Sequence, residues 1–299
     1  MSHTTSAVVA AAFVSTAKMG ADTQADSWAD FLSILQVFTG RSSTPALNVL
    51  SSWVFLLPVL AVSIVVAHSG WPCWRLGLLV VPMAIALIGG PMSICLHRYF
   101  GHSAFRTTRP FQFVLGLLSC LAWQRGPLWW AGKHRRHHKH CDGPGDPHSA
   151  VQTNFAYAWL GWTMSHKEAA LDSDFIVKLA SYPELRILDR LWMVPPLLAN
   201  AAVLNLAGGH VMICACTLPM LLCNLITLLF NVEYHPGHNP NPGAGGACKA
   251  VDIPRFLSEL VGESYHDDHH DHPKKAHRPG LDLPYHLVLA PLLALGLIW

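Results

Sequence analysis

Histidine carries most of the chemistry that this sequence can do. The chain of 299 residues contains 19 His, and eight of them fall in three clusters: HRYFGH at 97–102, HRRHH at 134–138 and HDDHH at 266–270. Imidazole binds iron, zinc, copper and nickel, so the residue type predicts a transition-metal site without choosing the metal. Eight or nine nitrogens are too many for one ion. The clusters therefore predict two metal ions with four or five ligands each.

The spacing within the clusters predicts how the rings are presented. In HRRHH and HDDHH the first His precedes the other two by three and four residues, so the three imidazoles project from one side of a helix. His97 and His102 are five residues apart, which is well beyond one turn of a regular α-helix. We therefore expect the helix to loosen near its end, so that both rings converge.

Long apolar segments must position these clusters. Hydrophobic residues make up 52% of the chain and charged residues only 13%, about half the charged share of a soluble protein. Four segments are long and apolar enough to cross a bilayer as helices, and they lie at 47–67, 76–96, 191–207 and 211–231. Short links join them in two pairs. This pattern predicts an all-α integral membrane protein, with four transmembrane helices in two hairpins and a cytosolic helical cap that holds the dimetal site.

Two further apolar segments are too short to span: 111–123 is expected to be a re-entrant or interfacial helix, and 287–299 an interfacial or packing segment. Residues 1–46 are interpreted as an N-terminal tail. Residues 47–299 are interpreted as a single membrane domain, with cytosolic regions at 97–190 and 232–299.

The distribution of basic residues predicts the orientation. Of the 20 Lys and Arg, 19 lie in the tail and in the two cytosolic regions, and only Arg75 lies in a link on the other side. Basic residues favour the cytoplasmic face, so all three histidine clusters should reach the cytosol. Asn231 and His235 follow the fourth apolar segment by no more than one helical turn and should reach the same side.

Composition and motifs exclude several other functions. A formal net charge of +2 offers no basic excess for binding nucleic acid. The eight Cys form no CxxC pair, so neither a disulfide scaffold nor a zinc ribbon is expected. A metal transporter would place polar ligands inside its spans, and a zinc protease would carry HExxH, which does not occur. The alternative to a specific metal site is a solvent-exposed histidine surface that binds metal adventitiously.

Other polar residues near the clusters keep two interpretations. Glu233, Asp267 and Asp268 are either carboxylate ligands or groups that orient ligands or face solvent. Four His beside the clusters either hydrogen-bond to ligands or lie on the surface, and these are His140, His148, His238 and His272. Five further His are interpreted as interfacial or ordinary polar residues, namely His68, His166, His210, His277 and His286.

Together, these motifs resemble the membrane fatty-acid desaturases, and among them the acyl-CoA group of the stearoyl-CoA, Δ9 type. The resemblance runs from about residue 75 to the end of the chain. It rests on HRYFGH at 97–102, WAGKHRRHH at 130–138, Asp146-Pro147-His148, NVEYH at 231–235, GESYHDDHH at 262–270 and Gly280-Leu281-Asp282.

The resemblance implies two irons and the removal of two hydrogens from a saturated acyl chain with O2 and two electrons. By position, it implies nine histidine ligands and one Asn that reaches a metal through water: His97, His102, His134, His137, His138, His235, His266, His269, His270 and Asn231. Five residues are assigned to the substrate or to the support of the ligands, and these are Trp130, Asp146, His148, Arg255 and Glu263.

The implied partners are a fatty acyl substrate, with acyl-CoA foremost, the lipid bilayer, and a separate electron donor such as cytochrome b5 or ferredoxin. The membrane would be the endoplasmic reticulum in a eukaryote and the plasma membrane in a bacterium.

The sequence also departs from the group. Trp159 stands where the family usually has His, and His235 is followed by Pro-Gly-His-Asn-Pro in place of an apolar continuation. Cys223 and Asn224 stand near positions where the group has Thr and a bulky residue beside the substrate bend. These changes leave chain length and double-bond position open. The sequence does not exclude a membrane di-iron hydroxylase, epoxidase or terminal-alkene-forming enzyme, because the same oxidant can perform those reactions.

Overall fold

Helices make up most of the described part of the chain. The structure is a computed structural model that describes residues 49–236 and 248–299, with the backbone alone at 49–53. Within these ranges no β-strand is present, and the sheet-like pairings are two isolated bridges, Thr107 with Ile298 and Asp252 with Tyr265. The mostly helical fold agrees with the predicted all-α class. The predicted tail at 1–46 lies outside the described residues.

Two helices in the described part are long and apolar enough to cross a membrane. The first runs over Trp74–Gly101 and consists of α4 (Trp74–Gly77), α5 (Val80–Leu87) and the π-helix η1 (Ile88–Gly101). The second runs over Gly209–Glu233 and consists of α13 (Gly209–Met212), the π-helix η5 (Ile213–Thr217) and α14 (Leu218–Glu233). They contain the predicted segments 76–96 and 211–231, which are therefore confirmed as long apolar helices.

The other two predicted segments are less regular. Helix α3 (Val49–Ser69) covers most of 47–67 and contains Pro58. Helices α11 (Pro183–Arg190) and α12 (Val194–Ala207) could together form one span, but they are bent by 62°. Proline occupies the first turn of α12, where its missing N–H and fixed φ favour a new helix start. The third predicted segment thus begins as a helix at Val194 rather than at 191, and the four-span arrangement stays a prediction.

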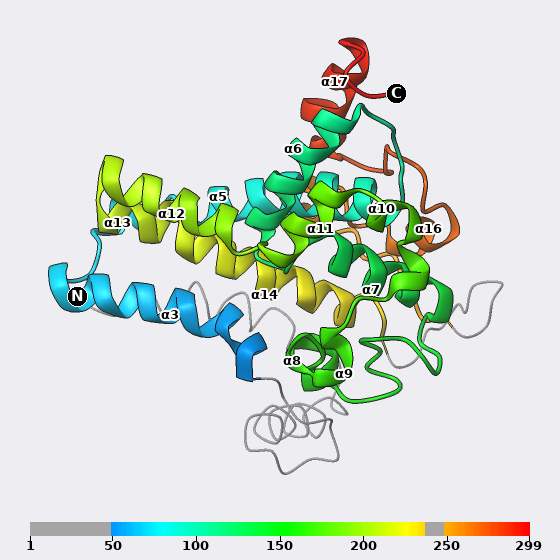
Figure 1. The fold of residues 1–299 in the computed structure, drawn as a ribbon, viewed down its shortest axis with the longest axis horizontal. Helices are drawn as coiled ribbons and strands as arrows, with labels where there is room; N and C mark the ends of the chain where they lie inside the picture. The colour runs from blue at the N-terminus through cyan, green and yellow to red at the C-terminus, as the bar shows by residue number, and fades with distance from the viewer. Residues whose placement is uncertain (1–48, 237–247) are drawn as a thin grey trace.

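The apolar helices gather at one end of the molecule, and the helices α7 (Pro127–His140) and α16 (His266–Asp271) lie at the other (Figure 1). Helix α14 packs against α5 and α3. The two links also meet, because His210 Nε2 donates to the carbonyl of Gly70 over 3.0 Å. Outward-facing residues such as Ile64, Leu78 and Leu198 are 59–65% exposed. Apolar surface of this kind is unfavourable in water and favourable against lipid.

Short helices complete the fold. They are α6 (Arg109–Ser119), η2 (Cys120–Ala122), η3 (Tyr157–Gly161), α8 (Trp162–Met164), α9 (His166–Ala169), η4 (Ser173–Phe175), α10 (Val177–Ala180), α15 (Phe256–Leu260), η6 (Tyr285–Leu289) and α17 (Ala290–Ala294). The predicted short segments 111–123 and 287–299 correspond to α6 with η2 and to η6 with α17.

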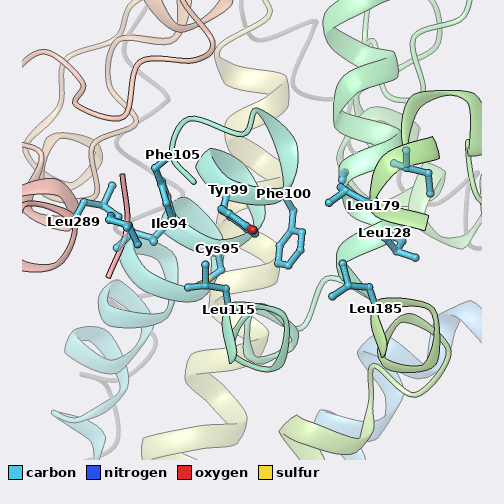
Figure 2. Close-up of a cluster of buried hydrophobic side chains, with 13 residues drawn as sticks. Ile94, Cys95, Tyr99, Phe100, Phe105, Leu115, Leu128, Leu179, Leu185 and Leu289 are labelled. Carbon is cyan, nitrogen blue, oxygen red and sulfur yellow. The ribbon is translucent and has the colours of Figure 1, made fainter. Parts of the chain in front are cut away.

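A buried apolar cluster fixes η1 against its neighbours (Figure 2). Phe100 of η1 is fully buried, and the same cluster contains Leu115 of α6, Leu128 of α7 and Leu185 of α11. Burying such side chains stabilises the contact by about 1.5–3 kcal/mol each. The cluster therefore holds the helix that carries His97 beside the helix that carries the second histidine cluster.

A fully buried ion pair ties η1 to the C-terminal region. Arg98 donates from both terminal nitrogens to the two carboxylate oxygens of Asp282, over 3.0 and 2.8 Å. Gly262 lies against this pair with φ +70°, and a Cβ there would collide with both Arg98 and Asp282. The pair and the glycine together bring the segment that begins at Gly262 onto η1. That segment carries Glu263 and the third histidine cluster.

We predict that Asp282→Asn destabilises the protein strongly, because it leaves the buried Arg98 guanidinium without a counter-charge. Loss of one partner of such a pair costs about 3–5 kcal/mol. Thermal unfolding of the detergent-solubilised protein should show a clear drop in Tm. Glu184→Gln is the matched control, since Glu184 pairs with Arg109 on the surface and its loss should leave the Tm nearly unchanged. Equal Tm values for the two variants would contradict a structural role of the buried pair.

Candidate metal centre

Eight histidines form two groups of four. His97, His102, His134 and His269 make up the first histidine group, and His137, His235, His266 and His270 make up the second histidine group. Within each group, one ligand atom of every residue lies within 4.8 Å of the others. In the first group, Nε2 of His97 lies 2.8 Å from Nε2 of His269. In the second, Nε2 of His235 lies 3.0 Å from Nε2 of His266.

His138 lies between the two groups. Its Nε2 is 3.0 Å from Nε2 of His269 in the first group, and its ring stacks on His270 of the second group with 4.1 Å between centroids. The structure thus brings together all nine histidines that the sequence singled out. They come from η1 and the residue that follows it, from α7, from the turn just after α14 and from α16.

The helix carrying the first cluster loosens as the spacing predicted. His97 and Gly101 lie on a π-helix, and the N–H of His102 donates to the carbonyl of His97, five residues earlier, over 3.2 Å. Five residues complete about one wide turn in this conformation. Gly101 suits this close approach, because a Cβ would lie 3.0 Å from the His134 ring and 3.2 Å from Trp130, and both rings would have to shift. The wide turn and the glycine let His102 and His134 approach to 2.7 Å between their Nε2 atoms.

Three carboxylates contact the Nδ1 atoms of converging histidines, on the side of each ring away from the other histidines. Glu263 lies 3.0 Å from Nδ1 of His97, Asp146 lies 2.8 Å from Nδ1 of His137, and Asp142 lies 2.8 Å from Nδ1 of His235. An ionised carboxylate only accepts hydrogen bonds, so each Nδ1 is the donor, and a neutral ring held in this way presents its Nε2 lone pair to a metal ion. Burial by itself raises the pKa of Glu263, but His97, Arg98 and Arg278 lower the pKa to about 2.

Burial disfavours the charged form of six of the converging imidazoles. Burial, followed by the neighbouring imidazoles, lowers the pKa well below its usual value for His102, His134, His138, His266, His269 and His270. Neutral nitrogens with lone pairs directed at one another about 3 Å apart need a proton or a cation between them. The donor set therefore fits two transition-metal ions bound by nitrogen ligands.

Asn231 lines a cavity beside the first histidine group. Its walls also include Trp130, His134, Glu263 and His266. The ring of Trp130 stacks on that of His134 with 4.6 Å between centroids, and its Nε1 donates to Gln124 Oε1 over 2.8 Å. The amide of Gln124 in turn donates to Thr227 Oγ1. Sequence reasoning missed Gln124 and Thr227. The sequence did contain a signal for each: Gln124 is a polar residue that directly follows the apolar segment 111–123, and Thr227 is a polar residue inside the apolar segment 211–231.

Some of the other candidate residues lie away from the two groups. Arg255 is a surface residue that pairs with Glu233 over 2.9 Å. The Asp268 carboxylate contacts Lys275, and the exposed backbone N–H of Asp267 donates to Asp252. His277 and His286 are exposed, with 5.2 Å between their rings. His238 lies outside the described residues.

His148 supports the second histidine group from behind. It is buried, and its ring stacks on that of His137 with 4.4 Å between centroids. Burial, followed by the neighbouring His137 imidazole, lowers the pKa of His148 to about 3. Its backbone N–H donates to Asp146, the carboxylate that orients His137. His148 and Asp146 therefore act on the position of a ligand.

The structure also contains a disulfide between Cys141 and Cys248, which the sequence did not predict. The two residues are separated by 107 positions, so no local spacing in the sequence indicates that they are in contact. The other six cysteines are free.

We predict that Glu263→Gln weakens metal binding about 10–100-fold, because a charged hydrogen bond that orients His97 is lost. Competition with a chelator of known affinity measures the change. The matched control is Glu233→Gln, whose carboxylate contacts Arg255 on the surface. A loss of affinity in the control as large as in Glu263→Gln would show that Glu263 has no special role.

Three relatives share parts of this chain. A stretch of 104 residues is 36% identical to the hex-5-enoyl-[acyl-carrier protein] acetylenase of Moorena producens (strain JHB), and it covers 31% of this chain and 32% of that protein. A stretch of 194 residues is 27% identical to the sn-1 stearoyl-lipid 9-desaturase of Anabaena variabilis, covering 64% and 70%. A stretch of 88 residues is 35% identical to an acyl-CoA Delta(11) desaturase of Choristoneura rosaceana, covering 28% and 26%.

The profile of the fatty acid desaturase family matches residues 69–286, which is well over half of the chain. All nine converging histidines fall inside the matched range. The chain therefore belongs to the fatty acid desaturase family.

Proposed function

We propose that this protein is an O2-dependent fatty acyl desaturase that introduces a cis double bond into a saturated acyl chain at a di-iron centre. The observation that carries the proposal is the convergence of nine imidazoles beside a cavity lined by both aromatic and polar side chains. No side chain is basic enough to remove a proton from an unactivated methylene. Two iron ions held by these histidines would supply the oxidant from O2 and two electrons.

The residues of the cavity would hold and shape the acyl chain. Trp130, Gln124 and Thr227 satisfy one another's polar atoms, so the wall they form presents mainly the indole face. The stack of Trp130 on His134 places that face directly beside a ligand of the first histidine group. We infer that the chain lies along Trp130 with the reacting methylenes toward the histidines, where the close packing excludes water. Asn231, in the same cavity, would reach one metal through water.

The carrier, topology and electron donor belong to the same proposal. Acyl-CoA is the carrier that we propose first, which the acyl-CoA Delta(11) desaturase relative supports. Four spans would place the histidine clusters on the cytosolic side, where a separate donor such as cytochrome b5 or ferredoxin could deliver electrons. The outward-facing apolar side chains of α3, α5 and α12 support contact with lipid.

A second candidate is an acetylenase, which would convert an existing double bond into a triple bond. The match at 36% identity to a protein named as an acetylenase acting on an acyl-carrier protein favours it. Both reactions remove two hydrogens from neighbouring carbons, so the same metal centre serves either. Oxygen insertion by hydroxylation or epoxidation, and formation of a terminal alkene, are further alternatives.

We predict that cells whose fatty acids are otherwise saturated accumulate cis-monounsaturated chains when they express this protein. Mass spectrometry with localisation of the double bond measures the product. An alkyne made only when an alkenyl precursor is fed would favour the acetylenase. A hydroxylated or epoxidised product without any alkene would refute the desaturase proposal.

The same product assay separates a nine-histidine centre from an eight-histidine centre. His235→Ala should abolish product, because the other ligands cannot close the gap without moving their helices. Asn231→Ala should be milder, since a second water can take its place. His277→Ala is the matched control, as His277 is exposed and outside both histidine groups. Near-normal product from His235→Ala would contradict the assignment.

A further inference from the structure

The Cys141–Cys248 disulfide lies against two residues of the second histidine group. Cys141 directly follows α7, and its Sγ is 3.7 Å from Nδ1 of His235. The Sγ of Cys248 is 3.5 Å from Nδ1 of His270. The two cysteines and the two histidines together form a compact set whose ligand atoms lie within 4.8 Å of one another. The disulfide therefore contacts the outer nitrogens of two ligands, on the side away from the neighbouring histidines.

Hydrogen bonds hold the same two segments together independently of the disulfide. Asp142, the residue after Cys141, accepts from Nδ1 of His235 over 2.8 Å and from the backbone N–H of Lys249 over 2.7 Å. The N–H of Val251 donates to the carbonyl of Tyr234 over 3.0 Å. Opening of the disulfide would therefore loosen the segment that starts at Cys248 without detaching it.

We propose that Cys141 and Cys248 form a reversible thiol–disulfide site, reduced by a dithiol, that controls how fast metal leaves the second histidine group. The proposal rests on the proposed function in one respect, the metal centre and its cytosolic side. Thiols in the cytosol are kept reduced, and disulfides that do form there are mostly transient or redox-sensing. A cross-link in contact with two metal ligands has the position that such a role requires.

The dithiol supplies both electrons for the reduction of the disulfide, so no other reductant is needed. Cys141 is 8% exposed and Cys248 is more accessible, so a thiolate of the dithiol attacks Sγ of Cys248. The bond between the two protein sulfurs breaks, and Cys141 leaves with the electron pair and takes up a proton. The second thiol of the reductant then displaces Cys248, which is protonated in turn. Two electrons have moved from the dithiol to the protein, and the reductant ends as a disulfide.

Reduction breaks the covalent link between the two cysteines, whose sulfur atoms contact the Nδ1 atoms of His235 and His270. Loss of an outer group that supports ligands changes metal affinity about 10–100-fold. We expect metal to leave the reduced protein about tenfold faster than the oxidised protein, at the lower end of that range.

The test uses the full chain in detergent, loaded anaerobically with Fe²⁺, with and without dithiothreitol. One readout is the number of cysteines labelled by N-ethylmaleimide after denaturation, measured by intact mass. The expected numbers are six without the dithiol and all eight with it. The second readout is the rate of Fe²⁺ transfer to a coloured chelator. The double variant Cys141→Ser with Cys248→Ser should release metal at the fast rate in both conditions, which also corrects for chelation by the dithiol. Cys73→Ser, at an exposed free cysteine, should respond like the unmodified chain.

Eight labels before reduction would overturn the proposal, and so would a release rate that stays the same while the label count changes. Failure to bind Fe²⁺ would also count against it. The proposed desaturation is judged separately, because neither readout depends on product formation. A protein that makes no unsaturated chain but shows both responses would keep the thiol site and lose the desaturase assignment.

Discussion

Neutral imidazoles packed with their Nε2 atoms 2.7–3.2 Å apart are the feature on which the rest of the structure depends. Each lone pair would repel the next if nothing lay between them, and burial prevents protonation from relieving the repulsion. Carboxylates behind His97, His137 and His235 fix which nitrogen faces inward. The arrangement therefore fits positive charge at two points, and a metal ion at each point would turn the repulsion into ligation.

The helices around the site serve this convergence. The wide turn of η1 brings His97 and His102 to one side, and Gly101 allows α7 to come close. The Arg98–Asp282 pair brings the last cluster back onto the first, across 184 residues of sequence. These features explain why His269, near the end of the chain, belongs to the same histidine group as His97 and His102, which lie at the end of an early apolar helix. They also place the site where the long apolar helices end (Figure 1).

Local patterns in the sequence were enough to predict the long apolar helices and most of the histidines that converge. The HxxHH spacing predicted three rings on one side of a helix, and the five-residue step from His97 to His102 predicted the loosened turn that the structure has. Contacts between distant segments left no such pattern. Asp142 and Lys249 are separated by 107 residues, and Gln124 and Thr227 by 103. The contact of Asp142 with His235, the hydrogen bonds that link Trp130, Gln124 and Thr227, and the cysteine pair could therefore be found only in three dimensions. Arg255, assigned from the sequence to the substrate or to ligand support, instead pairs with Glu233 on the surface.

The number of metal ions bound per chain tests the central claim most directly. Elemental analysis of purified, iron-replete protein, referred to protein concentration by amino-acid analysis, measures this ratio without relying on activity. Two histidine groups with a shared ninth ring predict two ions per chain. A ratio of one that persists after full reconstitution would contradict the account, since one histidine group would then stand without a cation among its facing lone pairs.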